Sequence, residues 1–327
     1  MMPTLLQVTD LKKHFPVKTG IFAHEEKKVV HAVDGVSFQV EEGETLGLVG
    51  ESGCGKTTTA RLLLRLIEPT SGTAIFDGVN IFRMEKKDLK SFRQKMKLVF
   101  QDPYASLNPR KTLGETLTNQ FTLQGIGREK ARDKTLELFE TVGLLPANNF
   151  YERHPHELSG GQRQRVAVAR ALGSHPKLIF ADEPVSALDV SIRGQILNLM
   201  KSLQQEFQLT YIFITHDLGV VRSICSRVAV MYLGRIVELA TVEEVFEHPL
   251  HPYTKALLSA TPIANPRRSR TREQLILTGE VPSPIDIPTG CRFAQRCPSR
   301  QEDCLNQEPE LAELRKKHWA ACYHPLE

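Results

Sequence analysis

Short runs of apolar residues recur along the chain, and each run stops at a glycine or a polar residue. The clearest lie at residues 45–49, 97–100, 178–181 and 210–214. A short run that is apolar without alternation is typical of a strand covered on both faces of a sheet. The pattern therefore predicts an α/β core built on buried strands.

The first part of the chain has a different pattern. Strand-like runs occur at residues 6–8, 29–33 and 36–40. Residues 72–82 form a predicted hairpin, because an Asp-Gly pair in the middle of the segment favours a tight turn. We interpret these segments as an N-terminal antiparallel β subdomain.

Helical spacing appears between and after these strands. Residues 58–66, which follow the Gly-rich segment 50–57, have a helical pattern, and residues 85–95 are strongly charged. Residues 127–142 have the apolar spacing of an amphipathic helix. Residues 243–260 are also helical in pattern, with a break at two prolines. We interpret residues 103–172 as a small α-helical subdomain inserted into the core.

Composition sets the broad class of the protein. Hydrophobic residues make up 41% and charged residues 24% of the 327 residues, which is ordinary for a globular protein. The net charge of +4 is too small to indicate a nucleic-acid partner. No apolar run reaches the length of about 18 residues that a transmembrane helix needs. Residues 1–15 lack the basic-then-apolar order of an export signal, so we expect a chain that is not exported.

The segment GESGCGKT, residues 50–57, has the spacing of a phosphate-binding loop, with a strand before it and a helix after it. Its glycines let successive backbone N–H groups converge on phosphate oxygens, and the helix start adds further donors. Lys56 is expected to bind the β- and γ-phosphates, Thr57 to bind Mg²⁺, and Cys54 to be a spacer. The flanking elements disfavour a chance Gly-rich turn. The predicted nucleotide-binding residues here are Gly50, Glu51, Ser52, Gly53, Cys54, Gly55, Lys56, Thr57 and Thr58.

A second anion-binding helix start follows at residues 158–162. Ser-Gly-Gly stands directly before a helical run, so that unpaired N–H groups face an incoming anion. Two such starts in one chain serve either two nucleotides, or one nucleotide held between two chains. The residues concerned are Ser159, Gly160, Gly161 and Gln162.

Polar side chains stand where three of the buried strands end. Asp182 is placed to bind Mg²⁺, and Glu183 follows it at once and can polarise a water aimed at the γ-phosphate. Two adjacent carboxylates at a strand end indicate a bound cation or a catalytic role; the alternative is a solvated acidic turn. Gln101 is a candidate for Mg²⁺ or the attacking water, and His216 for the γ-phosphate. Taken singly, a Gln at a strand end is usually solvated, and a lone His is more often structural.

Phe15 lies near the start of the chain, in the sequence Lys-His-Phe-Pro. An aromatic ring at the edge of a nucleotide site can stack on adenine. Spacing alone favours this role and a packed edge aromatic equally.

Four of the six cysteines lie after residue 290. In a chain that is not exported, such clustering favours a metal site over disulfides. The spacing contains no C-x-x-C pair and is atypical of a zinc knuckle. Four thiolates can hold either Zn²⁺ or a [4Fe–4S] cluster. The predicted ligands are Cys291, Cys297, Cys304 and Cys322.

We expect structural or solvent-exposed roles for two histidines near these cysteines, for Cys225 and for the Pro-rich segment that precedes the cysteines. His318 and His324 are spare ligands by position, but we expect ordinary surface histidines. Cys225, which stands alone, is expected to be a small buried residue. The Pro-rich segment before the cysteines contains a basic run at residues 267–272, which we interpret as a solvated linker; contact with a membrane surface is the alternative.

Taken together and in this order, these motifs resemble the complete motif set of the ATP-binding-cassette ATPases, over about residues 5–260. The resemblance adds the turn at residues 186–189 to the set. It implies that two cassettes pair head to tail, with ATP between the phosphate loop of one and residues 159–162 of the other. It also favours adenine stacking for Phe15.

A closer resemblance is to the ATP-binding subunits of dipeptide and oligopeptide importers. It rests on residues 12–17, 100–110 and 251–258 and on the cysteines near the C-terminal end. It implies as partners a homologous second ATP-binding subunit, two transmembrane permease subunits and an extracytoplasmic peptide-binding protein. It also implies a peripheral position on the cytoplasmic face of the inner membrane and favours the iron–sulfur cluster over zinc. Subunits for nickel and other small solutes look similar.

We therefore expect a P-loop ATPase with a mixed-sheet core, an antiparallel β subdomain, an inserted helical subdomain and a small Cys-rich extension. The predicted boundaries are residues 1–262 for the cassette and 263–327 for the linker and extension. The predicted cofactors are ATP, Mg²⁺ and a [4Fe–4S] cluster, and the function is energy coupling in a peptide importer. The alternatives are a soluble cassette acting on nucleic acid or the ribosome, and a non-catalytic regulatory module. The single cassette argues against the former, and the presence of Glu183 and His216 against the latter.

Overall fold

The computed structural model describes residues 3–17, 28–104, 107–260 and 279–327. The basic run at residues 267–272 lies outside these described residues.

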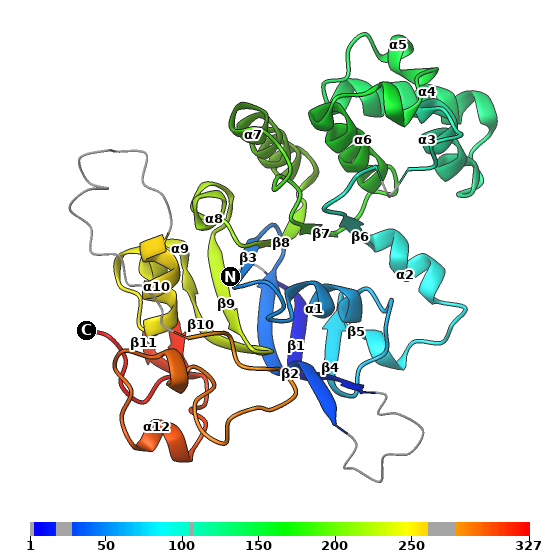
Figure 1. Cartoon of the computed structure of the whole chain (residues 1–327). Helices are drawn as coiled ribbons and strands as arrows, with labels where there is room; N and C mark the ends of the chain where they lie inside the picture. Colours follow the sequence, from blue (N-terminus) through cyan, green and yellow to red (C-terminus); the bar gives the residue numbers. More distant parts are fainter. Residues whose placement is uncertain (1–2, 18–27, 105–106, 261–278) are drawn as a thin grey trace. The chain divides into compact units, whose positions relative to one another are not determined.

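The chain divides into two compact units (Figure 1). The first unit contains Met1–Glu41, Thr45–Arg83 and Ile214–Glu327, and the second contains Glu42–Glu44 and Met84–Phe213. The polypeptide passes from the second unit back to the first within strand β8 (Thr210–Thr215), whose residues are all buried.

An antiparallel sheet forms one part of the first unit. Its order is β2-β1-β4-β5, with β1 at Thr4–Pro16, β2 at Val29–Glu41, β4 at Ser71–Phe76 and β5 at Val79–Asn80. Along β1, buried and exposed residues alternate, as expected of a strand with one face on a core. The predicted β subdomain and the 72–82 hairpin are confirmed, although the two strands predicted at 29–33 and 36–40 are one continuous strand.

A mixed sheet forms the other part of the first unit. Strand β3 (Thr45–Val49) runs parallel to β9 (Arg227–Tyr232), and β9 pairs antiparallel with β10 (Arg235–Thr241). Beyond β10 the sheet continues with β12 (His318–Ala320) and β11 (Ala312–Arg315), both antiparallel. The C-terminal part of the chain therefore completes a sheet that begins with the strand of the phosphate loop.

Two predicted helical segments of the first unit are observed: α1 begins at Lys56, two residues before the predicted start, and residues 242–247 and 252–260 are helical. Helix α9 starts at a Thr241 cap and α10 starts at Pro252, so the predicted break at the prolines is confirmed. The elements are α1 (Lys56–Leu63), η1 (Ile81–Arg83), α8 (Leu218–Ile224), α9 (Val242–Glu247), α10 (Pro252–Ala260), η3 (Ala294–Arg296) and α12 (Asp303–Asn306).

The second unit combines two parallel strands with a group of helices. Strand β6 (Met96–Val99) pairs with β7 (Leu178–Asp182), and all residues of β7 are buried. Within residues 103–172, α3 packs on α4 and α5, and α4 packs on α6. Helix α2 begins at Leu89, later than the predicted residue 85. The helices are α2 (Leu89–Lys95), α3 (Leu113–Thr122), α4 (Arg128–Thr141), α5 (Ala147–Tyr151), η2 (Pro155–Glu157), α6 (Gly160–Leu172) and α7 (Val190–Phe207).

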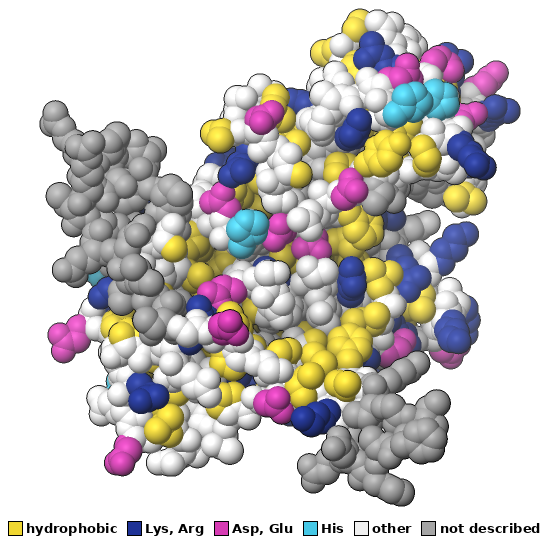
Figure 2. Space-filling view, in the orientation of Figure 1, with side chains coloured by type: hydrophobic (Ala, Val, Ile, Leu, Met, Phe, Trp, Pro, Cys, Tyr) yellow, Lys and Arg dark blue, Asp and Glu magenta, His cyan; other side chains and the backbone are white. Residues whose placement is uncertain are grey.

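Two further features are the distribution of charge on the surface and the hydrophobicity of the helices. On the face drawn in Figure 2, basic and acidic side chains are interspersed among apolar and polar ones. Among the described residues, no helix combines the length and the apolar character that crossing a bilayer requires.

The C-terminal segment contributes to the hydrophobic core of the first unit. Phe293 is 1% exposed and belongs to one buried cluster with Val49, Tyr232 and Tyr253. This segment therefore packs into the same core as the strand that precedes the phosphate loop.

Two expectations about single residues are wrong. His318 is 0% exposed, and its Nε2 lies 2.7 Å from Oε1 of the equally buried Glu238. Glu238 also accepts hydrogen bonds from the backbone N–H groups of Leu250 and His251. A pattern of apolar spacing does not reveal such a buried polar pair. Cys225 is only partly buried, because it lies at the C-terminal end of α8.

Replacing His318 with alanine removes a partner of a fully buried carboxylate. We expect the free energy of unfolding of this segment to fall by about 2 kcal/mol, the typical loss for a hydrogen bond to a charged group. Trp319 is the single tryptophan of the chain and lies in the same strand, so its fluorescence reports unfolding of β12 in urea.

The matched control is His248→Ala, because His248 is exposed at the end of α9. This variant should leave the urea midpoint of Trp319 fluorescence unchanged. An unchanged midpoint for His318→Ala, or equal shifts for the two variants, would contradict the structural role of the buried pair.

Candidate functional site

The phosphate loop joins β3 to α1 and lies directly against two neighbouring strands. Gly50 and Gly55 have φ angles of 150° and 109°. A Cβ atom at Gly50 would lie 2.2 Å from the carbonyl oxygen of Met231, and one at Gly55 would lie 2.2 Å from that of Ala32. Both positions therefore require glycine.

The Lys56 side chain folds back across this loop. Its Nζ donates hydrogen bonds to the carbonyl oxygens of Gly50 at 2.7 Å and Glu51 at 2.9 Å. The ammonium group is thereby held at the loop, where it can neutralise a bound polyphosphate. The buried Cys54 thiol lies 3.7 Å from the same Nζ, and burial raises its pKa. Cys54 is therefore a neutral packing group.

Side chains distant in sequence hold the loop at Glu51. The backbone N–H of Glu51 donates to the Tyr253 hydroxyl at 2.9 Å. Its carboxylate accepts hydrogen bonds from Nη1 and Nη2 of Arg296 at 2.8 and 3.0 Å. Sequence reasoning missed both partners, because a pair separated by 245 residues leaves no local pattern.

Phe15 lies at the end of β1 and is 37% exposed. The Lys13 ammonium lies 4.9 Å from the centre of its ring. Part of the ring is open to solvent, which is what stacking on a base requires.

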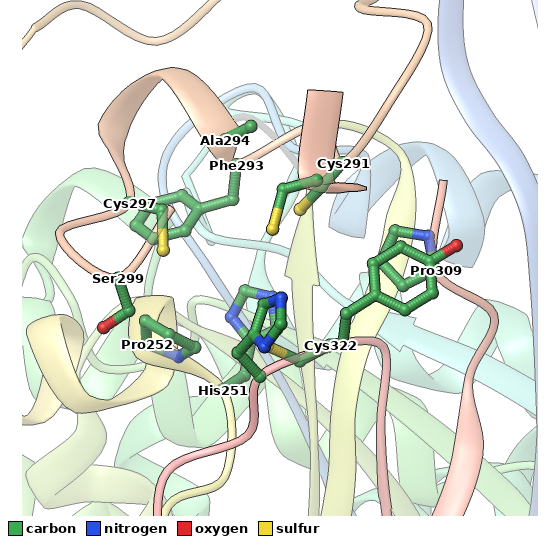
Figure 3. Close-up of a pocket in the computed structure, with 12 residues that line it drawn as sticks. His251, Pro252, Cys291, Phe293, Ala294, Cys297, Ser299, Pro309 and Cys322 are labelled. Atoms are coloured by element: carbon green, nitrogen blue, oxygen red, sulfur yellow. The ribbon is translucent and has the colours of Figure 1, made fainter. Parts of the chain in front are cut away.

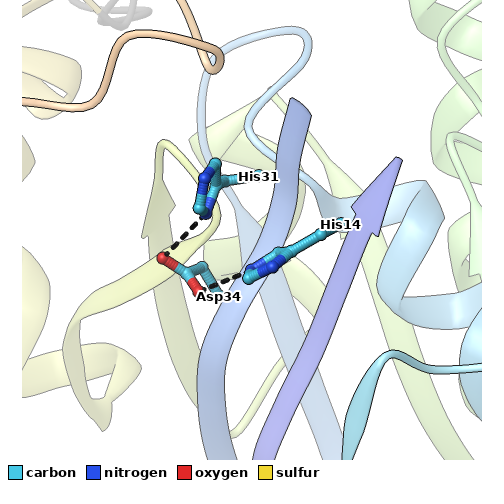
Figure 4. Close-up of side chains that lie close together, drawn as sticks. All are labelled: His14, His31 and Asp34. Carbon is cyan, nitrogen blue, oxygen red and sulfur yellow. Dashed lines mark hydrogen bonds and ion pairs between the residues drawn. The ribbon is translucent and has the colours of Figure 1, made fainter. Parts of the chain in front are cut away.

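His14, His31 and Asp34 form a polar cluster near Phe15 in the sequence (Figure 4). His14 Nε2 lies 2.8 Å and His31 Nδ1 3.6 Å from the Asp34 carboxylate, which Arg292 also binds. Burial opposes ionisation of Asp34, but the hydrogen bonds from Arg292 and His14 outweigh it and lower its pKa. Because the Arg292 guanidinium already neutralises the carboxylate, we interpret the cluster as an ion-pair network and not as a metal site.

In the second unit, the Ser-Gly-Gly segment begins α6 as predicted. The Ser159 hydroxyl accepts from the Gln162 N–H at 3.3 Å, and the Gln162 side chain accepts from the Ser159 N–H at 3.0 Å. This reciprocal cap fixes the first turn. Ser159 and Gly160 are exposed, so the helix start is open to a ligand.

The strand-end groups of the second unit lie at the end of β7. Asp182 is its last residue, and Glu183 follows with a φ of 48°, which is unusual for a residue with a side chain. The Ser186 hydroxyl, at the start of the turn predicted at residues 186–189, donates to the Glu183 carbonyl at 3.0 Å. Gln101 Nε2 donates to Glu183 Oε2 at 3.2 Å. The structure therefore brings Gln101 and Glu183 together, although 82 residues separate them.

His216 belongs to the first unit and follows the end of β8. The next residue, Asp217, caps α8 by accepting hydrogen bonds from the N–H groups of Gly219 and Val220. The cap fixes the backbone immediately after His216.

The four cysteines near the C-terminal end line one pocket of the first unit (Figure 3). All four are free thiols. Among the described residues, no three of their sulfurs lie within 4.8 Å of one another. One tetrahedral Zn²⁺ would hold four sulfurs about 3.8 Å apart, since Zn–S bonds are about 2.3 Å long. The four sulfurs are therefore not gathered as closely as a single bound zinc ion would hold them.

Burial favours the neutral form of two of these thiols. It raises the pKa of Cys291 to about 11 and that of Cys322 to about 12, and the neighbouring cysteines add to both shifts. Thiolates in this pocket therefore need a bound cation to compensate them.

Two histidines also line the pocket. His324 Nε2 lies 2.9 Å from both oxygens of Asp303, and these two residues with Cys304 form the tightest potential ligand set in the region. His251, which sequence reasoning missed, is fully buried; burial lowers its pKa to about 4 and keeps the ring neutral. Its Nδ1 accepts from the Tyr253 N–H at 3.1 Å, so its proton is on Nε2. His318 does not line this pocket.

Comparison with protein-family models identifies two regions. Residues 33–186 match the ABC transporter family. Residues 237–304 match the family described as oligopeptide/dipeptide transporter, C-terminal region.

Several curated proteins are similar over nearly the whole chain. The oligopeptide transport ATP-binding protein AppF of Bacillus subtilis is 51% identical, over 98% of this chain and 97% of that protein. The dipeptide transport ATP-binding protein DppF of Escherichia coli is 51% identical, over 94% and 90%. The oligopeptide transport ATP-binding protein OppF of Salmonella typhimurium is 48% identical, over 97% and 95%.

Solved structures share the fold. The ATP-binding cassette MJ0796, determined as a dimer in a post-hydrolysis state with ADP and Pi, superposes with a TM-score of 0.63 and 29% identity. That match covers 72% of this chain and 98% of MJ0796. CbiO1 of Clostridium perfringens, part of the transporter complex cbiONQ, gives a TM-score of 0.65 and 26% identity, over 75% and 91%.

Proposed function

Because the chain belongs to the family of ABC transporter ATP-binding proteins that includes the oligopeptide and dipeptide transport subunits, we propose that it hydrolyses ATP to drive peptide import. The observation that carries this conclusion is the identity of 46–51% to peptide-transport subunits over almost the full chain. The C-terminal match to the oligopeptide/dipeptide transporter region supports a peptide as the solute. Nickel or another small solute moved by the same mechanism is the alternative.

In this proposal the phosphate loop holds the triphosphate. Backbone N–H groups within residues 50–57, other than those of Glu51 and Cys54, donate to phosphate oxygens together with the start of α1, and Lys56 neutralises the β- and γ-phosphates. The hydroxyl of Thr58 adds a donor, and Phe15 stacks on the adenine. Mg²⁺, when bound, neutralises phosphate charge; Thr57, Gln101 and Asp182 are its proposed ligands, directly or through water.

Hydrolysis then depends on positioning an attacking water. Glu183 orients and polarises this water, and the hydrogen bond from Gln101 fixes the direction of its carboxylate. His216 supports the γ-phosphate. The exposed start of α6 binds the γ-phosphate of ATP held by the paired cassette, so that each nucleotide is enclosed by two chains. The dimeric MJ0796 structure supports pairing of cassettes as such.

The proposed partners follow from the same family. They are a homologous second cassette, two transmembrane permease subunits and an extracytoplasmic peptide-binding protein. The chain would then be a peripheral subunit on the cytoplasmic face of the inner membrane. A soluble cassette without a transporter is the weaker alternative, because the relatives that match nearly the whole chain are named as transport proteins.

We also propose that residues 263–327 are a linker and a Cys-rich extension that holds a [4Fe–4S] cluster on Cys291, Cys297, Cys304 and Cys322. Four thiols in one pocket can hold either a cluster or a single Zn²⁺, and the resemblance to the importer subunits favours the cluster; Zn²⁺ is the alternative. The neutral His251 ring lines the same pocket, and a histidine beside a metal site typically donates its ring N–H to a group that orients the ligands.

Purification of the tagged chain from membranes in mild detergent tests the transport assignment. We expect two multi-span membrane proteins and a second cassette subunit to co-purify, because the proposed assembly holds the chain at the membrane through these partners. Purification alone, or with ribosomes or nucleic acid, would contradict the importer assignment.

Glu183→Gln removes the group that polarises water and keeps its size. We expect ATP turnover to fall by at least about 100-fold, as is typical for loss of a general base, while ATP binding persists. Turnover is followed by phosphate release, and binding by equilibrium dialysis. Glu206→Gln, at an exposed position of α7, is the control and should retain both. Full turnover in Glu183→Gln would exclude Glu183 as the base.

Purification without oxygen, followed by metal analysis, tests the cysteine pocket. We expect about four iron and four sulfide ions per chain, with a visible charge-transfer absorption band. Cys322→Ser should lose them, whereas Cys225→Ser, a cysteine outside the pocket, should keep them. About one zinc and no iron per chain would contradict the cluster and favour the alternative.

A further inference from the structure

One short segment contains two of the four pocket cysteines and also contacts the phosphate loop. Cys291 and Cys297 lie at its two ends, and Phe293 and Arg296 lie between them. The segment is a tight series of turns, with backbone hydrogen bonds from Ala294 to Cys291 at 3.0 Å and from Arg296 to Phe293 at 2.9 Å. Fixing the two cysteines therefore fixes the side chains between them.

The first contact is the ion pair between Arg296 and Glu51. Two parallel hydrogen bonds of 2.8 and 3.0 Å join the guanidinium to the carboxylate. The Arg296 side chain is 8% exposed and that of Glu51 is 27% exposed. A bidentate pair of this burial is stronger and more directional than a surface salt bridge.

The second contact runs through three aromatic rings. The Phe293 ring lies 5.3 Å from that of Tyr232 and 5.4 Å from that of Tyr253, measured between ring centres. Tyr232 and Tyr253 are themselves 4.7 Å apart. The Tyr253 hydroxyl accepts the backbone N–H of Glu51. The segment thus acts on Glu51 at both its carboxylate and its backbone.

Glu51 in turn positions the cation of the nucleotide site. Its carbonyl oxygen accepts a hydrogen bond from Lys56 Nζ at 2.9 Å, and it follows Gly50 directly in the loop. A displacement of Glu51 therefore moves the anchor of Lys56 and the N–H groups beside it.

We propose that Arg296 is a positioning residue for the phosphate loop, so that occupancy of the four-cysteine pocket controls nucleotide affinity. The inference rests on the proposed nucleotide role of residues 50–57 and on the proposed metal occupant of the four-cysteine pocket. All the contacts that carry it lie within the first unit. Coupling between two sites is reciprocal, so bound nucleotide also stabilises the pocket.

The test measures nucleotide affinity in Arg296→Gln, with a fluorescent ATP analogue and the full chain purified without oxygen. We expect the affinity to fall by about tenfold, because the carboxylate of Glu51 loses a buried charged partner. Arg296→Lys, which keeps the charge, should recover part of the loss. Arg300→Gln, at an exposed arginine just beyond Cys297, is the control and should bind as the unmodified chain does. Urea unfolding followed by Trp319 fluorescence confirms that each variant is folded.

The second arm removes the contents of the pocket with ferricyanide and EDTA, a treatment that strips a cluster or zinc alike. We expect affinity in the unmodified chain to fall by about fivefold or more, the range of ordinary allosteric coupling. In Arg296→Gln the same treatment should have little further effect, because the connection is already broken. If Arg296 had a purely structural role, its substitution would not abolish the dependence of nucleotide affinity on the contents of the pocket.

The outcomes separate the two hypotheses. If the unmodified chain does not bind the ATP analogue, the proposed function fails. If it binds, and Arg296→Gln binds equally well, the positioning role of Arg296 is wrong. If the stripping treatment lowers the affinity of both proteins by the same factor, the coupling through Arg296 is wrong.

Discussion

The close approach of the phosphate loop to its neighbouring strands is the constraint on which the site depends. The loop lies against the carbonyl groups of Met231 and Ala32, and it can approach them so closely because Gly50 and Gly55 have no Cβ atom. In the proposed function, other backbone N–H groups of the loop bind an anion, whereas the N–H of Glu51 is used to hold the loop in place. The loop is held at Glu51, by the Tyr253 hydroxyl and the Arg296 guanidinium.

Local chemistry was predictable from the sequence, and long-range pairing was not. The loop, the Ser159 cap and the carboxylates after β7 each have a spacing that one element imposes, and the structure places them as expected on those elements. The buried pair of His318 and Glu238 and the contact of Arg296 with Glu51 join segments far apart in sequence. Only the folded chain brings the two members of each pair together. In the local sequence, each of these residues looks like an ordinary charged or polar surface residue.

The second unit shows how backbone strain can serve a site. Glu183 has a left-handed conformation, which costs about 1 kcal/mol for a residue with a side chain. The turn bonded through Ser186 and the hydrogen bond from Gln101 compensate for this cost and determine where the carboxylate points. The adjacent Asp182 ends a fully buried strand and needs no such strain.

The pairing of β12 with β10 has a consequence for synthesis of the chain. Every other strand of this sheet precedes β12 in the sequence, so the edge of β10 stays without a partner until the ribosome has made Ala320. An open edge offers backbone groups to strands of other nascent chains. Aggregation during translation is therefore most probable in the interval before β12 emerges, and a molecular chaperone that covers β10 would be most effective then.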